Sequence, residues 1–129
     1  MADTRLKVTF VDIEVNSDGD PIGKGELYWS CKVDGRVVSS RSVGNPLVIG
    51  SGGTINLGAS TTVIKGSGAG EKLVVSGSVS ERDDDDADEL APFSRDYTAV
   101  GNWGVDTIHR VDCMDRNLNA TLTYIIERA

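Results

Sequence analysis

The sequence predicts an all-β protein, an antiparallel β-sandwich of about eight strands, from three observations. Runs rich in Val, Ile and Thr recur along the 129 residues and are separated by Gly, Ser, Asn and Asp, with 15 Gly in all. Several runs alternate apolar and polar residues, as strands with one buried face do. No stretch has the apolar period of an amphipathic helix. Two packed sheets bury such strands, and we expect one domain over residues 1–129.

The first predicted strand, Leu6–Val15, changes its apolar phase partway along. Leu6, Val8 and Phe10 alternate with polar residues, and the apolar positions then shift to odd numbers. Because side chains of a strand alternate between faces, such a shift predicts a β-bulge or a strand that changes faces. The Gly- and Asp-rich segment 16–25 that follows is predicted to be a loop.

The next two strands form the clearest hairpin. Glu26–Val33 and Arg36–Val43 flank the dipeptide Asp34-Gly35, which is a strong signal for a two-residue hairpin turn. The segment 46–53 holds Pro and three Gly, so we expect a loose connection there.

The later strands are shorter or less regular: Thr54–Leu57, Thr61–Ile64, Leu73–Ser80, Asp96–Val100 and Asn117–Arg128. Of these, Asn117–Arg128 alternates most cleanly, which predicts one face in the core and one in solvent. The pattern weakens between Gly101 and Arg116, where Trp103, Ile108 and Val111 are predicted to cover one end of the core. Loops of a sandwich gather at its two ends, so the loops after the first and sixth strands can share one end.

Most of the net charge lies in one segment, Glu81–Glu89. It holds seven carboxylates and one Arg, whereas the whole chain has 20 acidic and 13 basic residues, for a net charge of −7. Like charges a few ångströms apart repel each other even in water. The segment is therefore either a solvated loop or a loop that binds a hard cation, because Ca²⁺ favours flexible, Asp-rich loops. Its position between two apolar segments, Leu73–Ser80 and Leu90–Phe93, anchors both ends and favours the cation site.

A second acidic feature precedes the hairpin. Asn16, Asp18 and Asp20 are spaced two residues apart, as at the start of an EF-hand loop. Pro21 then occupies the position of the motif's Gly, and Leu27 the position of its bidentate Glu. The segment is thus no EF-hand, but it can form one side of a site built from two loops.

The segment Val79–Ala91 resembles the third calcium loop of C2 domains, in which a strand ends in an acid, followed by any residue, an Asp and, a few residues on, Asp-x-Ile-Gly. Here Glu81 is the first acid, and Leu90 and Ala91 stand for the Ile and Gly. The first calcium loop of C2 domains also has a counterpart, with Asp18 or Asp20 followed by Gly25-Glu26-Leu27-Tyr28-Trp29. The likeness covers about a third of the chain.

The resemblance implies a C2-like β-sandwich with Ca²⁺ held between the 16–26 and 81–89 loops. The implied metal ligands are Asp18, Asp20, Glu26, Glu81, Asp83, Asp85 and Asp88, with Asp84 and Asp86 as further ligands or a solvated rim. A divalent ion between two acidic loops would relieve their mutual repulsion and order both. Replacing Asp83 and Asp85 with Asn is expected to remove calcium-dependent stabilisation while leaving the fold intact in chelator.

These observations predict a calcium-binding module for interaction or assembly, whose partner is a protein that could be a second copy of the chain. Contact with phospholipid is expected only through bridging Ca²⁺, because the sequence has no compact basic patch. The alternative is a metal-free structural or protein-interaction sandwich whose acidic loop faces a basic partner.

Other classes of function are disfavoured. The acidic charge argues against nucleic-acid binding, which needs clustered Lys and Arg. Enzymatic activity is not expected, because the single His, His109, has no nucleophile motif to act with. The N-terminal segment lacks the apolar run of a signal peptide, so we expect a cytoplasmic protein unless a non-standard route exports it.

Overall fold

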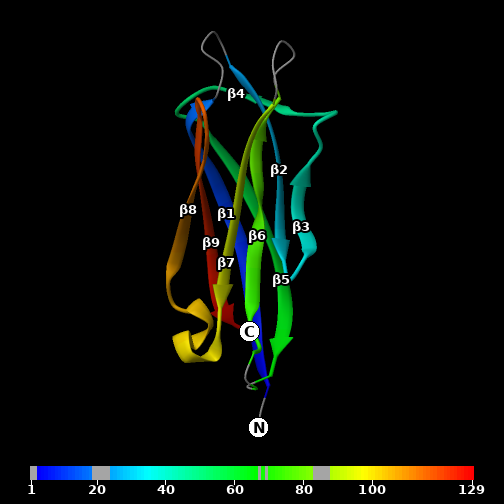
Figure 1. Cartoon of the computed structure of the whole chain (residues 1–129), viewed down its shortest axis with the longest axis vertical. Coiled ribbons are helices and arrows are strands. Elements are labelled where there is room, and N and C mark those ends of the chain that lie inside the picture. The colour runs from blue at the N-terminus through cyan, green and yellow to red at the C-terminus, as the bar shows by residue number, and fades with distance from the viewer. Residues whose placement is uncertain (1–2, 19–23, 67, 69, 83–87) are drawn as a thin grey trace.

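A computed structural model describes residues 3–18, 24–66, 68, 70–82 and 88–129. In these ranges the chain forms nine strands and one short 3₁₀ helix (Figure 1). The elements are β1 (Thr4–Asp18), β2 (Gly25–Val33), β3 (Arg36–Arg41), β4 (Leu47–Ile49), β5 (Thr54–Lys65), β6 (Leu73–Glu81), β7 (Glu89–Tyr97), η1 (Ala99–Gly104), β8 (Ile108–Asp115) and β9 (Leu118–Arg128).

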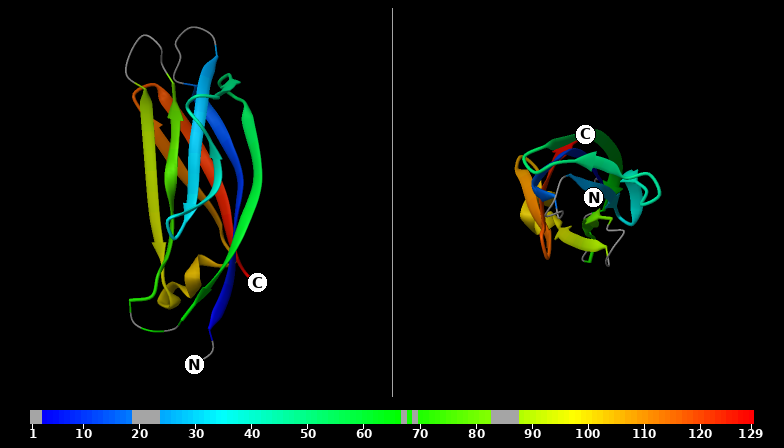
Figure 2. Two further views of the ribbon diagram at one scale, coloured as in Figure 1. Left: turned by 90° about the vertical axis from the view of Figure 1, so that its right-hand side faces the viewer. Right: turned by 90° about the horizontal axis from the view of Figure 1, so that it is seen from above.

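The strands form two sheets that pack face to face (Figure 2). One sheet has the order β5-β1-β9-β8, and the other has the order β3-β2-β6-β7, with β4 also paired to β2. Every strand pair is antiparallel. The predicted all-β antiparallel sandwich is therefore confirmed.

The core lies between the two sheets and is built from alternate residues of their strands. In β2, the buried residues Leu27, Trp29, Cys31 and Val33 alternate with half-buried ones that face outward. Each fully buried aliphatic side chain contributes roughly 1.5–3 kcal/mol to the free energy of unfolding. This alternation fixes which side chains at the strand ends point between the sheets and which point outward.

The phase change predicted in the first strand is a β-bulge. The register of β1 shifts between Phe10 and Asp12 against both of its neighbours, β5 and β9. Opposite the bulge, Gly58 has φ +60°, a conformation that is easy only for glycine. The chain thus continues through Gly58, and β5 is one strand where the sequence predicted two, Thr54–Leu57 and Thr61–Ile64.

Four other expectations about the elements were wrong. β1 continues to Asp18, because Ser17 and Asp18 still pair with Asn119 and Leu118 of β9. The connection 46–53 contains the short strand β4. The strand predicted at Asp96–Val100 lies earlier, as β7, and a 3₁₀ helix follows it. The strand β8 occupies part of the weakly patterned segment, and Ile108 is 59% exposed instead of covering the core.

The two ends of the sandwich differ in their side chains. The acidic end is formed by the end of β1, the start of β2, the end of β6 and the start of β7 (Figure 1, top). The aromatic end is formed by η1 and the strand ends beside it. We name it for four residues that cluster there, Tyr97, Trp103, His109 and Tyr124.

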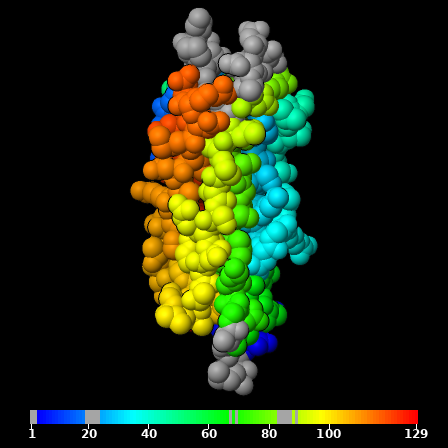
Figure 3. Space-filling view, viewed as in Figure 1, coloured from blue at the N-terminus to red at the C-terminus, as the bar shows by residue number. Residues whose placement is uncertain are grey.

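A seam joins the two sheets along one side, where β7 and β8 lie next to each other on the surface (Figure 3). Near the acidic end, the backbone N–H of Leu90 donates a hydrogen bond to Asp115 Oδ2 at 2.8 Å. Among the described residues, no helix has the length and apolar character needed to cross a membrane. The cytoplasmic location stays a prediction.

Candidate metal site at the acidic end

The described residues that flank the two predicted loops lie at the same end of the sandwich. A Cβ atom at Gly25 would lie 2.3 Å from the carbonyl oxygen of Asp18, so the end of β1 packs directly against the start of β2. The backbone N–H of Arg82 donates to the carbonyl oxygen of Glu26 at 2.8 Å, which joins the start of β2 to the end of β6. Residues 18, 24–26, 81–82 and 88 therefore surround one end of the core.

Two of the predicted ligands, Asp18 and Glu81, point inward and are each only 4% exposed. Glu81 continues the inward-facing series of β6 after Val79 and pairs with Leu27 of β2. Burying a carboxylate is costly unless hydrogen bonds or a cation compensate for the lost hydration. The inward direction of these two side chains thus places negative charge between the sheets.

Asp18 is held by the connection between β4 and β5. The backbone N–H of Ser51 donates to Asp18 Oδ2 at 3.2 Å, and the backbone N–H of Asp18 donates to Ser51 Oγ at 3.1 Å. These reciprocal hydrogen bonds fix the direction of the carboxylate.

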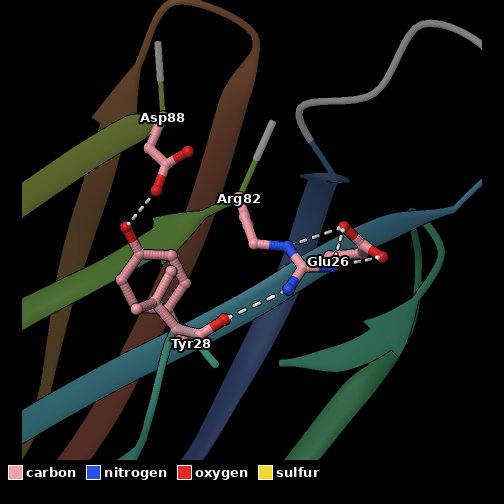
Figure 4. Close-up of polar contacts among 5 residues, drawn as sticks. Glu26, Tyr28, Arg82 and Asp88 are labelled. Carbon is pink, nitrogen blue, oxygen red and sulfur yellow. Dashed lines mark hydrogen bonds and ion pairs between the residues drawn. The ribbon is translucent and has the colours of Figure 1, made fainter. Parts of the chain in front are cut away.

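Glu26, another predicted ligand, is engaged by Arg82 (Figure 4). Arg82 Nε and Nη2 donate to the two Glu26 carboxylate oxygens, both at 3.2 Å. Arg82 Nη1 also donates to the carbonyl oxygen of Val43 at 3.4 Å. Both side chains of the ion pair are about one-third exposed, at 31% and 32%. The guanidinium therefore binds Glu26 through both carboxylate oxygens, a bidentate geometry that is stronger and more specific than a single hydrogen bond.

Asp88 is engaged by Tyr28 on the outer face of the same sheet (Figure 4). The Tyr28 hydroxyl donates to Asp88 Oδ2 at 2.8 Å. Partial burial, followed by this hydrogen bond and the nearby negative charge of Asp88, raises the pKa of Tyr28 to about 12. The phenol is therefore neutral over the physiological range and acts as a hydrogen-bond donor.

The predicted ligands therefore divide into two sets and a remainder. Asp18 and Glu81 point between the sheets, whereas Glu26 and Asp88 lie with Arg82 and Tyr28 on the outer side. The remainder, Asp20, Asp83 and Asp85, lie outside the described residues, as do Asp84 and Asp86. Within the described ranges, no group of three or more His, Cys, Asp or Glu side chains is arranged to hold a metal ion.

Sequence reasoning missed two residues of this end, Ser51 and Asp115. It also missed that Arg82 pairs with Glu26. Asp115 ends β8 and was overlooked with that strand, whose outward-facing Ile108 and Met114 blur the alternation. The short turn between Asp115 and Leu118 was the available signal for a hairpin. Ser51 and the pairing of Arg82 with Glu26 have no local signal, because both contacts join segments far apart in the sequence.

Comparisons with known proteins identify the architecture. The sequence matches no family model and no curated protein. Among solved structures, the C2A and C2B domains of Extended-Synaptotagmin 2 match 97% of this chain at a TM-score of 0.60 and 17% identity. The chain spans only 40% of the length of that two-domain structure. A calcium-bound structure of the same two domains matches 97% of the chain at 0.59 and 16%, over 45% of its length.

A C2 domain protein from Ramazzottius varieornatus matches 99% of this chain and 90% of its own length, at a TM-score of 0.51 and 11% identity. These identities are low, so the likeness concerns the fold. It extends over nearly the whole chain, beyond the two loops on which the sequence resemblance was based. The chain thus has the C2-like β-sandwich fold that its sequence predicted.

Proposed function

We propose that this chain is a calcium-binding C2-like module for interaction or assembly. The observation that carries the proposal is the burial of Asp18 and Glu81 between the sheets, at the end where both acidic loops begin. Two buried carboxylates and a nearby run of acids are mutually repulsive, and a divalent ion would offset that repulsion.

The described residues supply part of a calcium site. Ca²⁺ takes six to eight oxygen ligands, and carboxylates from separate loops suit its flexible geometry. Asp18 and Glu81 would contribute oxygens from between the sheets. Asp20, Asp83 and Asp85, outside the described residues, are the proposed source of the others. Glu26 and Asp88, which Arg82 and Tyr28 bind, are the other predicted ligands among the described residues.

The metal-free sandwich remains a second candidate, and specific contacts favour it. Asp18 is hydrogen bonded to Ser51, Glu26 is paired with Arg82, and Asp88 accepts from Tyr28. These three carboxylates therefore have protein partners in the absence of an ion. In this alternative, the remaining negative charge would attract a basic protein partner.

A binding role is favoured over catalysis by the position of His109. Its Nε2–H donates to the carbonyl oxygen of Gly104 at 2.7 Å, which leaves Nδ1 to accept from the Tyr97 hydroxyl at 3.3 Å. Both ring nitrogens are thus used in a half-buried network at the aromatic end. We propose that His109 is structural.

The proposed partner is a protein, either a second copy of the chain or a different protein, that meets the acidic end. Leu90 and Met114, on neighbouring strands β7 and β8, are 56% and 62% exposed there. They offer apolar contact area beside the acidic loops. Sedimentation with Ca²⁺ would detect self-association, and co-sedimentation with anionic vesicles would detect a calcium-bridged lipid contact instead.

Calcium titration of the wild type and a variant without the buried charges tests the function. At a concentration of 100 Kd, Ca²⁺ is expected to add about 2.7 kcal/mol to the free energy of unfolding. That corresponds to a Tm increase of roughly 8 °C for a domain of this size. The double variant Asp18→Asn/Glu81→Gln should lose the increase.

The matched control is Glu71→Gln/Asp106→Asn, which removes two exposed charges from the opposite half of the molecule. It should respond to Ca²⁺ as the wild type does. A wild type with no heat of binding and no change in Tm would reject the calcium site and leave the metal-free sandwich.

A further inference from the structure

The strand β5 is an edge of its sheet. Among the described residues, its backbone pairs with β1 alone, from Thr54 opposite Glu14 to Lys65 opposite Thr4. An edge strand leaves a row of backbone N–H and C=O groups that can pair with another strand. β5 has 12 residues, so this row runs along much of the sandwich (Figure 1).

The other described edges carry features that oppose strand pairing. β3 has six residues and begins and ends with Arg36 and Arg41, and β4 has only three residues. β7 contains Pro92, which lacks a backbone N–H, and β7 and β8 lie against each other at the seam. Short length, charge, proline and coverage are means by which sheets avoid pairing at their edges.

β5 has neither a proline nor a charge directed along its edge. Its residues 54–64 are uncharged, and its last residue, Lys65, forms an ion pair with Asp34 at 2.7 Å. The Lys65 side chain is only 13% exposed, because it is held against the hairpin turn of the other sheet. A bulge interrupts β5 at Gly58, and residues 59–65 beyond it pair regularly with β1. We call residues 59–65 the edge segment.

The edge segment leaves apolar side chains partly uncovered. Val63 packs against the core but is only half-buried, and Ile64 faces outward and is 59% exposed. Residues with branched Cβ atoms favour extended strands. High β-propensity, low charge and the absence of proline are properties of segments that pair with their own copies. A further strand on this edge would cover Val63 from the side.

A second copy of the chain fits this edge. Two identical strands that pair antiparallel about a twofold axis place one residue opposite its own copy. With the axis at Thr62, the middle of the edge segment, Thr61 of one copy lies opposite Val63 of the other. Ser60 then lies opposite Ile64. Each outward residue meets an outward one, and no charged residue is opposed by another.

This arrangement also keeps the excess negative charge of the two copies apart. β5 starts near the acidic end, where Ser51 is bonded to Asp18, and it ends at the other end of the sandwich, where Lys65 pairs with Thr4 (Figure 1). In an antiparallel pair, the two acidic ends therefore point in opposite directions. Because each copy has a net charge of −7, self-association is favoured through an uncharged segment away from the acidic end.

We propose that β5 is a self-association edge, through which two copies of the chain form an antiparallel dimer and join their four-stranded sheets into one. The proposal goes beyond the calcium function and does not depend on it, since no residue of β5 is a predicted metal ligand. The dimer presents one acidic end on each side. The edge segment spans only about 24 Å, so the dimer is expected to be weak and dependent on concentration.

Sedimentation of the whole chain in chelator tests the proposal. The wild type should change from monomer to dimer between about 10 µM and about 1 mM, the range of weak interfaces. Thr62→Lys should weaken the dimer at least about tenfold, because it places two like charges directly opposite each other at the axis. Thr62→Glu should have the same effect. Thr62 is exposed, so both variants should fold, which thermal melting verifies.

Mixing the two variants gives a result that a folding defect cannot imitate. An equimolar mixture of Thr62→Lys and Thr62→Glu should dimerise again, because opposite charges then face each other. The matched control is Ser94→Lys, which adds the same charge at an exposed position of the edge strand β7. Its dimer affinity should stay within about twofold of the wild type.

Four results would overturn the proposal. A wild type that stays monomeric up to about 1 mM would leave the β5 edge to an extended segment of a different protein. A dimer that Thr62→Lys leaves intact, or that Ser94→Lys weakens equally, would place the interface elsewhere. A mixture that stays monomeric would reject the pairing of Thr62 with its own copy. A dimer that forms only with Ca²⁺ would assign self-association to the acidic end.

Calcium binding is measured separately, by calorimetry on the wild type and Thr62→Lys. Both should bind Ca²⁺ equally, because residue 62 is remote from the acidic end. The failure of either proposal therefore leaves the other standing.

Discussion

The two ends of this sandwich place different kinds of side chain between the sheets. At the aromatic end, the core is closed by Trp103, which is 3% exposed, and by the stacked rings of His109 and Tyr124, 5.1 Å apart. The polar atoms there bind one another: the Tyr97 hydroxyl contacts both the Tyr124 hydroxyl and His109. The polar groups of this cluster are therefore hydrogen bonded within the protein.

At the acidic end, carboxylates occupy the space between the sheets that aromatic rings occupy at the other end. Asp18 and Glu81 occupy inward-facing positions and are each 4% exposed, while Glu26 is bound by the guanidinium of Arg82. The comparison teaches that the two ends place different side chains between the sheets. One end closes the core with aromatic rings, and the other holds the two buried carboxylates on which the calcium proposal rests.

The backbone of the aromatic end shows how strongly that end is determined by packing. Asn102, Trp103 and Gly104 are consecutive residues in the left-handed region, with φ values of +51°, +58° and +67°. Such a conformation costs roughly 1–2 kcal/mol for each residue other than Gly. Burial of the Trp103 ring offsets this cost, so the strain marks a structural role.

The largest expected effect comes from Trp103→Ala, which opens the aromatic end. Loss of the buried ring and the resulting cavity should lower the free energy of unfolding by about 3–5 kcal/mol in urea denaturation. The calcium affinity of the folded fraction should stay within about twofold of the wild type. A larger loss of affinity would show that the two ends are coupled, which would break the comparison.

At the acidic end, the double variant Asp18→Asn/Glu81→Gln should stabilise the protein in chelator. Removing two buried like charges is expected to raise the free energy of unfolding by about 1–2 kcal/mol, because the amides keep the shape without the repulsion. The measurement is urea denaturation with and without Ca²⁺. A destabilised variant in chelator would mean that the two carboxylates have a structural role in the metal-free fold.

The smallest expected effect is on the pH dependence of the free energy of unfolding, through Tyr28. Its pKa of about 12 in the folded protein lies above the ordinary value of 10.0, so folding favours the neutral phenol. The associated stabilisation is fully present below about pH 10 and is lost as the pH rises towards 12. Compared with Tyr28→Phe, the wild type should therefore lose more stability between pH 10 and 12 in urea denaturation. Parallel curves would show that folding does not raise the pKa of Tyr28.

The sequence was sufficient for those parts of the fold that follow local rules. The hairpin at Asp34-Gly35, the bulge in the first strand and the clean alternation of the last strand are all encoded by neighbouring residues. The sequence-based prediction failed at β5, because Gly58 was read as the end of one strand and the start of a turn. It also failed at β8, where exposed apolar side chains hid the alternation of buried and exposed residues.

The candidate site was predictable only in part. The resemblance and the charge run identified the acidic residues, and the sandwich architecture predicted that their loops share an end. The direction of each side chain depends on strand register, which sends Glu81 inward and Glu26 outward. The engagement of Glu26 by Arg82 joins residues 56 positions apart, beyond the reach of local pattern.

A crystal structure of the wild type grown with Ca²⁺ tests the central claim most directly. The account predicts an ion at the acidic end, with carboxylate oxygens of Asp18 and Glu81 at about 2.3–2.6 Å. A structure at saturating Ca²⁺ that has no ion between these two carboxylates would contradict it.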